Sequence, residues 1–587
     1  MDGILEKTIV ATQFFNFPAG VSLALDSGKT LSNVTIAYET YGTLSAKKDN
    51  AILICHALSG DAHAAFYSSA EDKKPGWWDT MIGPGKPFDT EKYFIICSNV
   101  IGGCKGSTGP SSVNPETGRP YGPSFPFITI GDMVRAQAHL IDHLGIGRLF
   151  AVAGGSMGGM QAMEWARSYP KRVRLCLPVA TALYQSTQNI ALHEIGRKSI
   201  MSDPNYRGGN FYDGEHPKAG LSIARMVGHI SYLSDDAMTK KFGRRLQNME
   251  RYAFDLTDEF EVESYLDYQG ESFIKRFDAN SYIYITRAID YFDIGYEAAS
   301  LDKAFPKSDA RFLVISFSSD WLYPPYQSEE IVTACKANHR PVTYVNITTN
   351  AGHDAFLIRN QTQEAVVRDF LDNEYRSIAE DRSHHFISSQ NDIPRFDHRL
   401  IFDEIPSHSR VLDLGCGDGF LMHMLAKEKG CLTQGVEIDH ANFLSCVSKR
   451  VDVIKHDFND IFNGYPDNSF DYVLFNLTIQ MTINASEALD AAVRVGRTVI
   501  VSFPNFAYIG NTVAFLSQGR MPKSKWLPFE WYDSPNIRMV TLKDFAVMCE
   551  EKGYNVRARY FYDETDIVWL LPNIFAPYCM FVFEKGR

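Results

Sequence analysis

Short, uninterrupted runs of apolar residues recur through the first part of the chain, each bounded by Gly, Pro or polar residues. They cover 51–55, 93–98, 149–153, 173–179, 312–317 and 342–347. Runs of this length without alternation are typical of parallel strands that are buried on both faces. From 180 to about 305 the strand pattern stops, and 221–233 and 272–292 have helical spacing instead. The pattern predicts an α/β sheet with a helical lid inserted into it.

A second α/β pattern follows a polar stretch. Between 372 and 393 the residues are mostly Ser, Asp, Asn, Glu and Arg, which is typical of a linker. Strand-like runs then return at 410–414, 432–437, 452–455, 470–476, 497–502, 556–562 and 578–583. A capping box at Thr541–Asp544 predicts the start of the helix before the sixth run. We predict two α/β domains, 1–375 (lid about 180–305) and 394–587, joined by a linker at 376–393.

Composition and charge narrow the range of partners. The chain has 587 residues, of which 45% are hydrophobic and 22% charged, as in ordinary globular proteins. Its net charge is −12 and Lys and Arg are not clustered, so we expect no nucleic-acid partner. The longest uncharged runs, 498–519 and 567–583, are interrupted by Pro and Asn and do not read as membrane spans. We expect no membrane partner.

The cysteines and the N-terminus indicate the compartment. None of the ten Cys forms a Cys-x-x-Cys pair, which argues against a zinc ribbon, and we expect no metal. Several Cys lie in strand-like runs, where a reduced thiol behaves as a small hydrophobe. Residues 1–17 lack the basic start and long apolar stretch of a signal peptide. We therefore predict a cytoplasmic protein.

A candidate nucleophile lies between the run 149–153 and a helical pattern. Gly154-Gly155-Ser156-Met157-Gly158 has the form Gly-x-Ser-x-Gly, and strand, tight turn and helix are the setting that this motif needs. The turn would expose the Ser156 hydroxyl at a helix N-terminus, which favours developing negative charge. A glycine-rich turn without chemistry is the alternative.

A serine nucleophile needs a base, and the base needs a carboxylate that orients it. In an α/β-hydrolase sheet the three follow in the order Ser, Asp, His, each just past a strand. Asp320 follows the run 312–317, and His353 follows 342–347, the last strand of this domain. We predict the catalytic triad Ser156, Asp320 and His353.

Two backbone N–H groups are expected to form the oxyanion hole. One is that of Met157, directly after the nucleophile, and the other is that of Leu58, in the loop after the strand 51–55. His56, in the same loop, is interpreted as a residue that shapes the loop and not as a catalytic group.

At this point the chain resembles the homoserine O-acyltransferases of the MetX type. The resemblance covers nearly all of 10–370 and is carried by CHALSGDAH (55–63), SNVIGGCKGSTGPSS (98–112), AVAGGSMGGMQAMEW (151–165), GLSIARMVGHISYLS (220–234) and NAGHDAFL (350–357). It implies an α/β-hydrolase fold with a helical lid, a homodimer built through the lid, and transfer of an acyl group from acyl-CoA to L-homoserine.

The resemblance also implies the residues that bind a zwitterionic substrate. It places Arg225 at the substrate carboxylate and Asp354 at the amino group, with Tyr232 beside them. A salt bridge within the lid is the alternative for Arg225. Such a pair argues against a plain esterase, because an ester has no zwitterion to bind.

The acyl donor is predicted from one position. Succinyl-using relatives tend to have Arg where Leu322 stands, and leucine offers a carboxylate no partner. We therefore expect acetyl-CoA as co-substrate. Succinyl-CoA as donor and L-serine as acceptor remain the alternatives, and a pure binding module is disfavoured by the complete triad.

The second domain carries a glycine-rich loop. The strand 410–414 contains Asp413 and runs into Gly415, Gly417 and Gly419, and Glu437 ends the next strand. Glycines let the backbone approach a ligand. An acidic residue at the end of the second strand, such as Glu437, can accept hydrogen bonds from both ribose hydroxyls. The Asp-x-Gly-x-Gly-x-Gly form resembles class I S-adenosylmethionine-dependent methyltransferases, and Asp457 could reach the adenine amino group.

From 394 onward the chain resembles MetW, a methyltransferase-like family associated with methionine synthesis. The resemblance is carried by SRVLDLGCGDGF (409–420), SFPNFAYIGN (502–511) and 520–545. It implies a Rossmann-like class I methyltransferase fold. The sequence leaves two hypotheses: this domain methylates an acceptor whose site is not evident, or it binds S-adenosylmethionine and stabilises or regulates the acyltransferase. The second is preferred because S-adenosylmethionine lies downstream of homoserine acylation.

Overall fold

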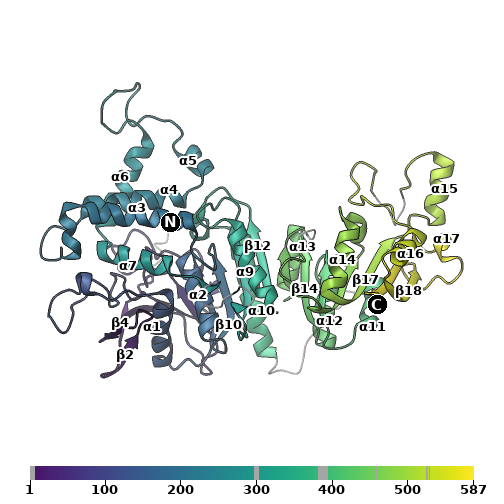
Figure 1. Ribbon diagram of the computed structural model, residues 1–587, viewed down its shortest axis with the longest axis horizontal. Helices are drawn as coiled ribbons and strands as arrows, with labels where there is room; N and C mark the ends of the chain where they lie inside the picture. Colours follow the sequence, from purple (N-terminus) through teal and green to yellow (C-terminus); the bar gives the residue numbers. More distant parts are fainter. Residues whose placement is uncertain are drawn as a thin grey trace, which may run out of the picture. The chain divides into compact units, whose positions relative to one another are not determined.

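A computed structural model describes residues 7–295, 300, 303–380, 394–457, 461–523, 527 and 529–586 (Figure 1). The chain forms two compact units, residues 1–340 with 345–368, and residues 341–344 with 369–587. Within the described residues, no helix has both the length and the apolar character needed to span a bilayer. All ten cysteines are free thiols.

The sheet of the first unit contains the six predicted runs. Its order is β1-β4-β8-β5-β9-β10-β11-β12, with β1 (Gln13–Asn16), β4 (Thr35–Tyr41), β8 (Phe94–Ser98), β5 (Ala51–Cys55), β9 (Leu149–Gly155), β10 (Val173–Val179), β11 (Arg311–Phe317) and β12 (Val342–Ile347). The pairs β5–β8, β5–β9, β9–β10 and β10–β11 are parallel, whereas β1 and β4 join the edge antiparallel. Every residue of β5 and β9 is buried, as the uninterrupted apolar runs predict.

Helices connect or follow the strands of this sheet. They are α1 (Ile130–His143), α2 (Met157–Ser168), α9 (Pro325–Ala337) and α10 (Gln361–Glu380). Two small ribbons, β2 (Ser22–Ala24) with β3 (Thr30–Ser32) and β6 (Ile82–Gly83) with β7 (Phe88–Asp89), lie outside the main sheet.

The lid is helical, as the interruption of the strand pattern predicts. It contains α3 (Thr187–Ser202), α4 (Lys218–Tyr232), α5 (Asp235–Lys241), α6 (Glu261–Ile274) and α7 (Ala279–Asp290), which gather on one side of the first unit (Figure 1). The helical spacing at 272–292 is divided between two helices. Asp278 is extended and its carboxylate accepts the N–H of Ser281, so it caps a new helix instead of continuing the old one.

The second unit is a doubly wound sheet. Its order is β15-β14-β13-β16-β17-β19-β18, with β13 (Arg410–Leu414), β14 (Leu432–Glu437), β15 (Asp452–Lys455), β16 (Phe470–Asn476), β17 (Gly496–Pro504), β18 (Asn555–Tyr562) and β19 (Tyr578–Glu584). The first five strands are parallel in the order 3-2-1-4-5, and β19 pairs antiparallel with β17 and β18. The strand order reverses between β13 and β16, and ligands of such sheets bind at that point, beyond the carboxyl ends of the strands.

The second unit contains helices before and between its strands. They are α11 (Phe396–Glu404), α12 (Phe420–Lys429), α13 (His440–Ser448), α14 (Ala485–Val495), α15 (Ile509–Gln518), α16 (Leu542–Glu551) and α17 (Pro572–Phe575). Thr541 caps α16 by accepting the N–H of Asp544, as predicted. Of the predicted linker, 376–380 continue α10, and 381–393 lie outside the described residues.

Candidate functional site

Ser156 occupies a sharp turn between β9 and α2. Its backbone has φ 58° and ψ −125°, a conformation that a residue with a side chain rarely adopts. The turn is possible because glycines surround it. A Cβ on Gly154 would lie 2.5 Å from the carbonyl carbon of Gly158, and a Cβ on Gly158 would overlap the carbonyl oxygen of Cys55. The strained turn presents Ser156 at the N-terminus of α2, at the carboxyl edge of the sheet.

His353 and Asp320 form a buried pair at the same edge. The Nδ1 of His353 lies 2.8 Å from Oδ2 of Asp320, and the residues are only 4% and 2% exposed. Oδ1 of Asp320 accepts the N–H groups of Leu322 and Tyr323, which fixes the carboxylate. With the Nδ1 proton held by this carboxylate, Nε2 is available as an acceptor. The structure thus brings together two residues that lie 33 positions apart.

The charge of Asp320 tunes the imidazole. Burial works to lower the pKa of His353, but the neighbouring Asp320 carboxylate outweighs burial, so this pKa lies above its ordinary value. The imidazolium form is therefore stabilised, as a base that takes up a proton during catalysis requires.

Two aromatic side chains connect the serine turn with the histidine. The Phe356 ring is centred 5.6 Å from the His353 ring, and a Cβ on Gly155 would run into Phe356. The Tyr323 ring is centred 5.2 Å from that of His353, and its hydroxyl lies 3.0 Å from Oε1 of Gln185. Burial raises the pKa of Tyr323, while hydrogen bonds with the side chains of Gln185 and Ser156 oppose this. The serine turn and the imidazole therefore share their neighbours.

The loop after β5 holds the predicted oxyanion donor Leu58. His56 fixes this loop, since its Nδ1 lies 2.8 Å from the carbonyl of Ala57 and its Nε2 accepts the N–H of Val100 at 3.0 Å. Burial lowers the pKa of His56, which keeps the ring neutral for this pattern. The interpretation of His56 as a loop-shaping residue fits these contacts. Met157, the other predicted donor, is the first residue of α2, and the first N–H groups of a helix have no partner within it.

The three residues predicted to bind the substrate lie in the lid and in the loop that follows β12. Arg225 of α4 lies over the rings of Tyr232 and Phe273, at 5.5 and 4.8 Å, and its Nη1 is 3.4 Å from Oγ of Ser59, next to Leu58. Burial raises the pKa of Tyr232 and of Asp354, and Arg225 lowers both. Arg225, Tyr232 and Asp354 therefore lie within electrostatic reach of one another, beside His353.

Arg276 is a member of this group that sequence reasoning missed. Its Nη1 donates to the carbonyl of Ser59 at 2.9 Å, and its guanidinium lies 5.2 Å from the centre of the Phe273 ring. Burial, and then Arg225, lower its pKa. No motif marks Arg276, because it lies in the short connection between α6 and α7. Tyr323 and Phe356, by contrast, follow Asp320 and His353 by three positions each, so proximity to the triad could have drawn attention to them.

The glycine-rich loop of the second unit has a different geometry. Gly415, Gly417 and Gly419 all have positive φ, of 78°, 56° and 79°, and Gly419 precedes α12 directly. A Cβ on Gly417 would meet nothing within 4 Å, so this glycine faces open space. The loop is therefore a backbone cradle of the kind that a nucleoside ligand needs.

Two acids flank the cradle. Oε2 of Glu437 accepts the N–H of Gly417 at 2.8 Å, and Oε1 accepts those of Ile438 and Asp439. Burial, and then Glu437, raise the pKa of Asp413 to about 7, and Oδ1 of Asp413 is buried without a hydrogen-bonding partner. Hydrogen bonds thus hold the Glu437 carboxylate against the loop, and its oxygens can still accept further hydrogen bonds. The Asp413 carboxylate has one buried oxygen without a hydrogen-bonding partner. Asp457 is exposed, past the end of β15.

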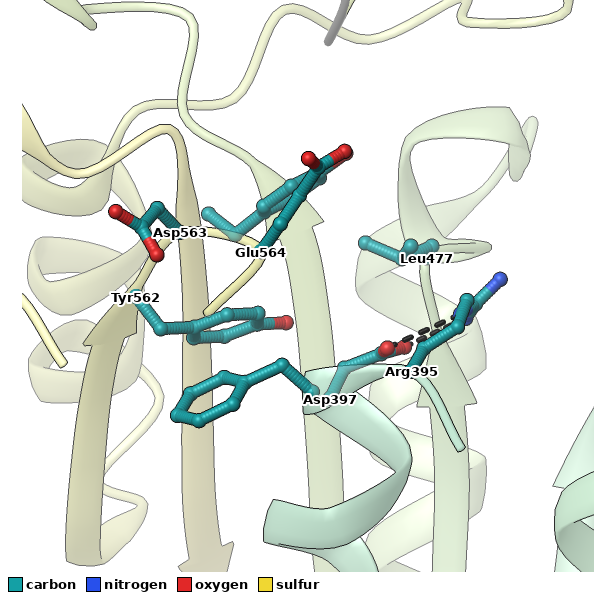
Figure 2. Close-up of a pocket in the computed structure, with 8 residues that line it drawn as sticks. Arg395, Asp397, Leu477, Tyr562, Asp563 and Glu564 are labelled. Atoms are coloured by element: carbon teal, nitrogen blue, oxygen red, sulfur yellow. Dashed lines mark hydrogen bonds and ion pairs between the residues drawn. The ribbon is translucent and has the colours of Figure 1, made fainter. Parts of the chain in front are cut away.

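A pocket of about 250 Å³ belongs to the same ligand site. Arg395 and Asp397, which form a bidentate ion pair, line it together with Leu477 and Tyr562 (Figure 2). The charges of Arg395 and Asp397 act on Asp413 of the cradle. The pocket therefore extends this ligand site along the carboxyl edge of the second sheet.

The described residues contain no group of three or more His, Cys, Asp or Glu side chains that could hold a metal ion.

Family models match both parts of the chain. A model described as "alpha/beta hydrolase fold" matches residues 50–359, and the model "Methionine biosynthesis protein MetW" matches residues 395–583.

Individual proteins resemble one or both parts. A homoserine O-acetyltransferase of Methanohalobium evestigatum is 59% identical over 368 residues, 63% of this chain and 74% of that protein. A bifunctional methionine biosynthesis protein MetXA/MetW of Rhodopirellula baltica is 42% identical over 556 residues, 92% of this chain and 88% of that protein.

Solved structures resemble the first part. A homoserine O-acetyltransferase from Bacillus anthracis matches with a TM-score of 0.58 at 31% identity, over 62% of this chain and 98% of that one. Esterase E22 matches with a TM-score of 0.57, also at 31% identity, over 62% of this chain and 100% of that one.

The strained serine, the buried histidine–aspartate pair and the helical lid define the first unit as a serine α/β-hydrolase of the group that includes homoserine O-acetyltransferases and esterases. Over nearly its whole length, the chain belongs to the family of bifunctional MetXA/MetW methionine biosynthesis proteins.

Proposed function

We propose that this protein makes O-acetyl-L-homoserine from acetyl-CoA and L-homoserine, with an acetyl group carried on Ser156. The observation that carries the proposal is the buried His353–Asp320 pair at 2.8 Å, next to a serine on a strained turn. The arginine and carboxylate on the lid side then distinguish a zwitterionic acceptor from a simple ester.

In the first half-reaction the Ser156 hydroxyl attacks the thioester carbonyl of acetyl-CoA. Nε2 of His353 takes the hydroxyl proton, and Asp320 stabilises the resulting imidazolium. The N–H groups of Leu58 and Met157 would receive the negative charge that develops on the carbonyl oxygen. The carbon–sulfur bond breaks, His353 returns the proton to the leaving sulfur, and CoA departs as its thiol.

In the second half-reaction L-homoserine occupies the place of CoA. Arg225 binds its carboxylate and Asp354 its ammonium group, with Tyr232 beside them. His353 removes the proton of the homoserine hydroxyl, whose oxygen attacks the carbonyl carbon of the acetyl ester. The bond between this carbon and the Ser156 oxygen breaks, and His353 returns the proton to Ser156. Both triad partners of Ser156 are almost fully buried beneath aromatic side chains, and this shielding from water favours transfer over hydrolysis.

The donor is assigned to acetyl-CoA. Leu322 is the residue from which we infer the acyl donor. Its aliphatic side chain is almost buried, and its backbone carbonyl accepts a hydrogen bond from the side-chain amide of Asn189. A succinyl carboxylate would find no charge partner in the Leu322 side chain, and desolvating an unpaired carboxylate is costly. Succinyl transfer is therefore not favoured.

The test is a panel on the purified full-length chain that offers acetyl- and succinyl-CoA against homoserine and serine. Release of CoA and the ester product are measured separately, because an esterase would release CoA without an acceptor. Beyond the one equivalent released when Ser156 is acylated, we expect CoA release to depend on homoserine and to match O-acetylhomoserine one to one. Continuous CoA release that is independent of any amino acid would replace the transferase with a hydrolase.

For the second unit we propose S-adenosylmethionine binding with a regulatory or stabilising role. Glu437 would accept the ribose hydroxyls, the Gly415–Gly419 backbone would approach the methionine part, and Asp457 would reach the adenine amino group. S-adenosylmethionine supplies an activated methyl group when bound. The open space at Gly417 and the unpartnered Oδ1 of Asp413 support a polar ligand here. Methylation of an acceptor is the second hypothesis.

Calorimetry with S-adenosylmethionine tests this proposal. Gly417→Leu fills the open space, whereas Gly553→Leu is a matched control in the same unit, with a similar positive φ (67° against 56°) and open surroundings. We expect heat of binding in the wild type and in Gly553→Leu, and none in Gly417→Leu. No heat in the wild-type protein would remove both ligand-based hypotheses, and the activity panel repeated with S-adenosylmethionine would distinguish regulation from methylation.

A homodimer built through the lid and a cytoplasmic location remain predictions from the sequence. Light scattering on the purified chain tests the first.

A further inference from the structure

The loop after β5 ends in a tight turn that contains the predicted oxyanion donor Leu58. The N–H of Gly60 donates to the carbonyl of Ala57 at 2.9 Å, which closes a four-residue turn with Leu58 and Ser59 at its corners. The N–H of the second residue is not used to close such a turn. Within the described residues, the N–H of Leu58 has no hydrogen-bonding acceptor. The direction of this N–H therefore depends on what holds the corners of the turn.

Two arginines of the lid hold these corners. Nη1 of Arg276 donates to the carbonyl oxygen of Ser59 at 2.9 Å, and Nη1 of Arg225 lies 3.4 Å from the Ser59 hydroxyl. Among the residues that the structure describes, Leu58 and Ser59 form no other hydrogen bond. The base of the loop is fixed separately, by the two ring nitrogens of His56. The lid thus provides the hydrogen bonds that orient the corners of the turn.

An aromatic ring, and not an acid, places Arg276 for this contact. Its guanidinium lies 5.2 Å from the centre of the buried Phe273 ring, and the guanidinium of Arg225 lies 4.8 Å from the same centre. In the described part of the chain, neither guanidinium forms an ion pair with a carboxylate. The N–H groups of Arg276 are therefore available to the Ser59 carbonyl, and Phe273 keeps the guanidinium beside the turn.

We propose that Arg276 is a positioning residue, which orients the N–H of Leu58 toward the oxyanion through its hydrogen bond to Ser59. Donors of an oxyanion hole act by pointing in advance at the place where negative charge develops. Without Arg276, the backbone at the corner of the turn loses its hydrogen bond to the lid, and the Leu58 N–H is no longer held in one direction. The inference rests on the acyl-enzyme of the proposed function and adds a lid residue to its first step.

Acetylation by p-nitrophenyl acetate tests the inference, because this ester offers neither a carboxylate nor a phosphate to an arginine. The burst of p-nitrophenol from the full-length protein gives the acetylation rate constant at saturating ester. We expect Arg276→Leu to lower this rate constant roughly tenfold, less than the 10²–10³-fold that loss of a donor costs, because the Leu58 N–H is still present. A burst in the wild type that is unchanged in Arg276→Leu would overturn this inference alone. Absence of the burst in the wild type would overturn the acyl-enzyme as well.

Two further variants separate the hydrogen bond from folding of the lid. Arg276→Lys keeps one donor for the Ser59 carbonyl, so we expect it to recover part of the lost rate. Arg245→Leu is the matched control, because Arg245 is also an exposed lid arginine that donates to a backbone carbonyl, but to that of Lys241 within the lid. We expect the control to match the wild type, with melting temperatures measured for all three variants. Equal losses in Arg276→Leu and in either of the other two variants would contradict a role through this one hydrogen bond.

Steady-state kinetics with the natural substrates distinguish positioning from binding. We expect Arg276→Leu to lower kcat and to leave the KM values for homoserine and acetyl-CoA nearly unchanged, because both half-reactions form an oxyanion at the same place. A raised KM for homoserine with an unchanged p-nitrophenol burst would assign Arg276 to the substrate carboxylate. A raised KM for acetyl-CoA with an unchanged burst would assign it to the phosphates of CoA. Either result would overturn the inference.

Discussion

Both units place glycines in a turn at the carboxyl edge of a sheet, but the glycines serve different purposes. Around Ser156 they are required by crowding, since a Cβ on Gly158 would overlap the carbonyl oxygen of Cys55. In the second unit, a Cβ on Gly417 would meet nothing within 4 Å. A glycine that is packed against backbone positions a side chain, whereas a glycine that faces open space leaves room for a ligand.

The two regions also differ in how their acids are used. Both carboxylate oxygens of Asp320 form hydrogen bonds within the protein, one with His353 and the other with two backbone N–H groups. The carboxylate is therefore already oriented before any substrate binds. Asp413 has a buried oxygen without a partner, and the pKa of Asp413 is raised to about 7. The first site is preorganised for covalent chemistry, and the second lacks partners that a ligand could provide.

The largest effect should come from Ser156→Ala. Acetyl transfer should fall by roughly ten-thousandfold or more, because the variant lacks the hydroxyl that carries the acetyl group. O-acetylhomoserine formation measures this, with circular dichroism as the check on folding. Binding of S-adenosylmethionine to the second unit should be unchanged. Retained turnover in this variant would remove the covalent mechanism.

The glycine comparison itself predicts unequal costs. Gly158→Ala should lower the free energy of unfolding by about 3 kcal/mol, because the new methyl group forces the strand and helix apart. Gly417→Ala should cost only about 1 kcal/mol, for the positive φ alone. Scanning calorimetry of both full-length variants measures the difference. Equal destabilisation would contradict the distinction between packed and open glycines.

Changing the group that binds the substrate carboxylate should affect only the second half-reaction. Arg225→Lys keeps the charge but loses the fork of donors, and should lower kcat/KM for homoserine by roughly a hundredfold. The burst of CoA released from acetyl-CoA alone should persist. Arg245→Lys, which changes an exposed arginine paired with Glu261 on the lid, is the control. An equal loss of the burst would assign Arg225 to the donor or to the fold.

The smallest predicted effect is the fall of kcat/KM on the acid side of the pH profile. His353 must be neutral to accept a proton, and its pKa is raised by Asp320, so kcat/KM should fall tenfold per pH unit below a pKa that lies above the ordinary 6.5 or so. Rates of the free enzyme between pH 5 and 9 test this. A limb at or below the ordinary histidine value would mean that burial outweighs Asp320.

Motifs in the sequence predicted most of the residues of the first site. The Gly-x-Ser-x-Gly pattern needs only local geometry, so it predicted the turn at Ser156, and Asp320 and His353 were predicted because strand ends in such a sheet meet at one edge. The antiparallel strands β1 and β4 were missed because Thr, Glu and Gln interrupt their apolar positions. The helical spacing at 272–292 could not reveal that Asp278 starts a new helix.

Local spacing and glycine sterics were sufficient to predict the two α/β patterns, the helical lid, and the residues that follow each strand. Folding of the whole chain brought further side chains to the site: Arg276 approaches the loop at Ser59, and Tyr323 and Phe356 pack against the ring of His353. Such contacts depend on how strands and helices pack, and packing is a property of the whole folded chain.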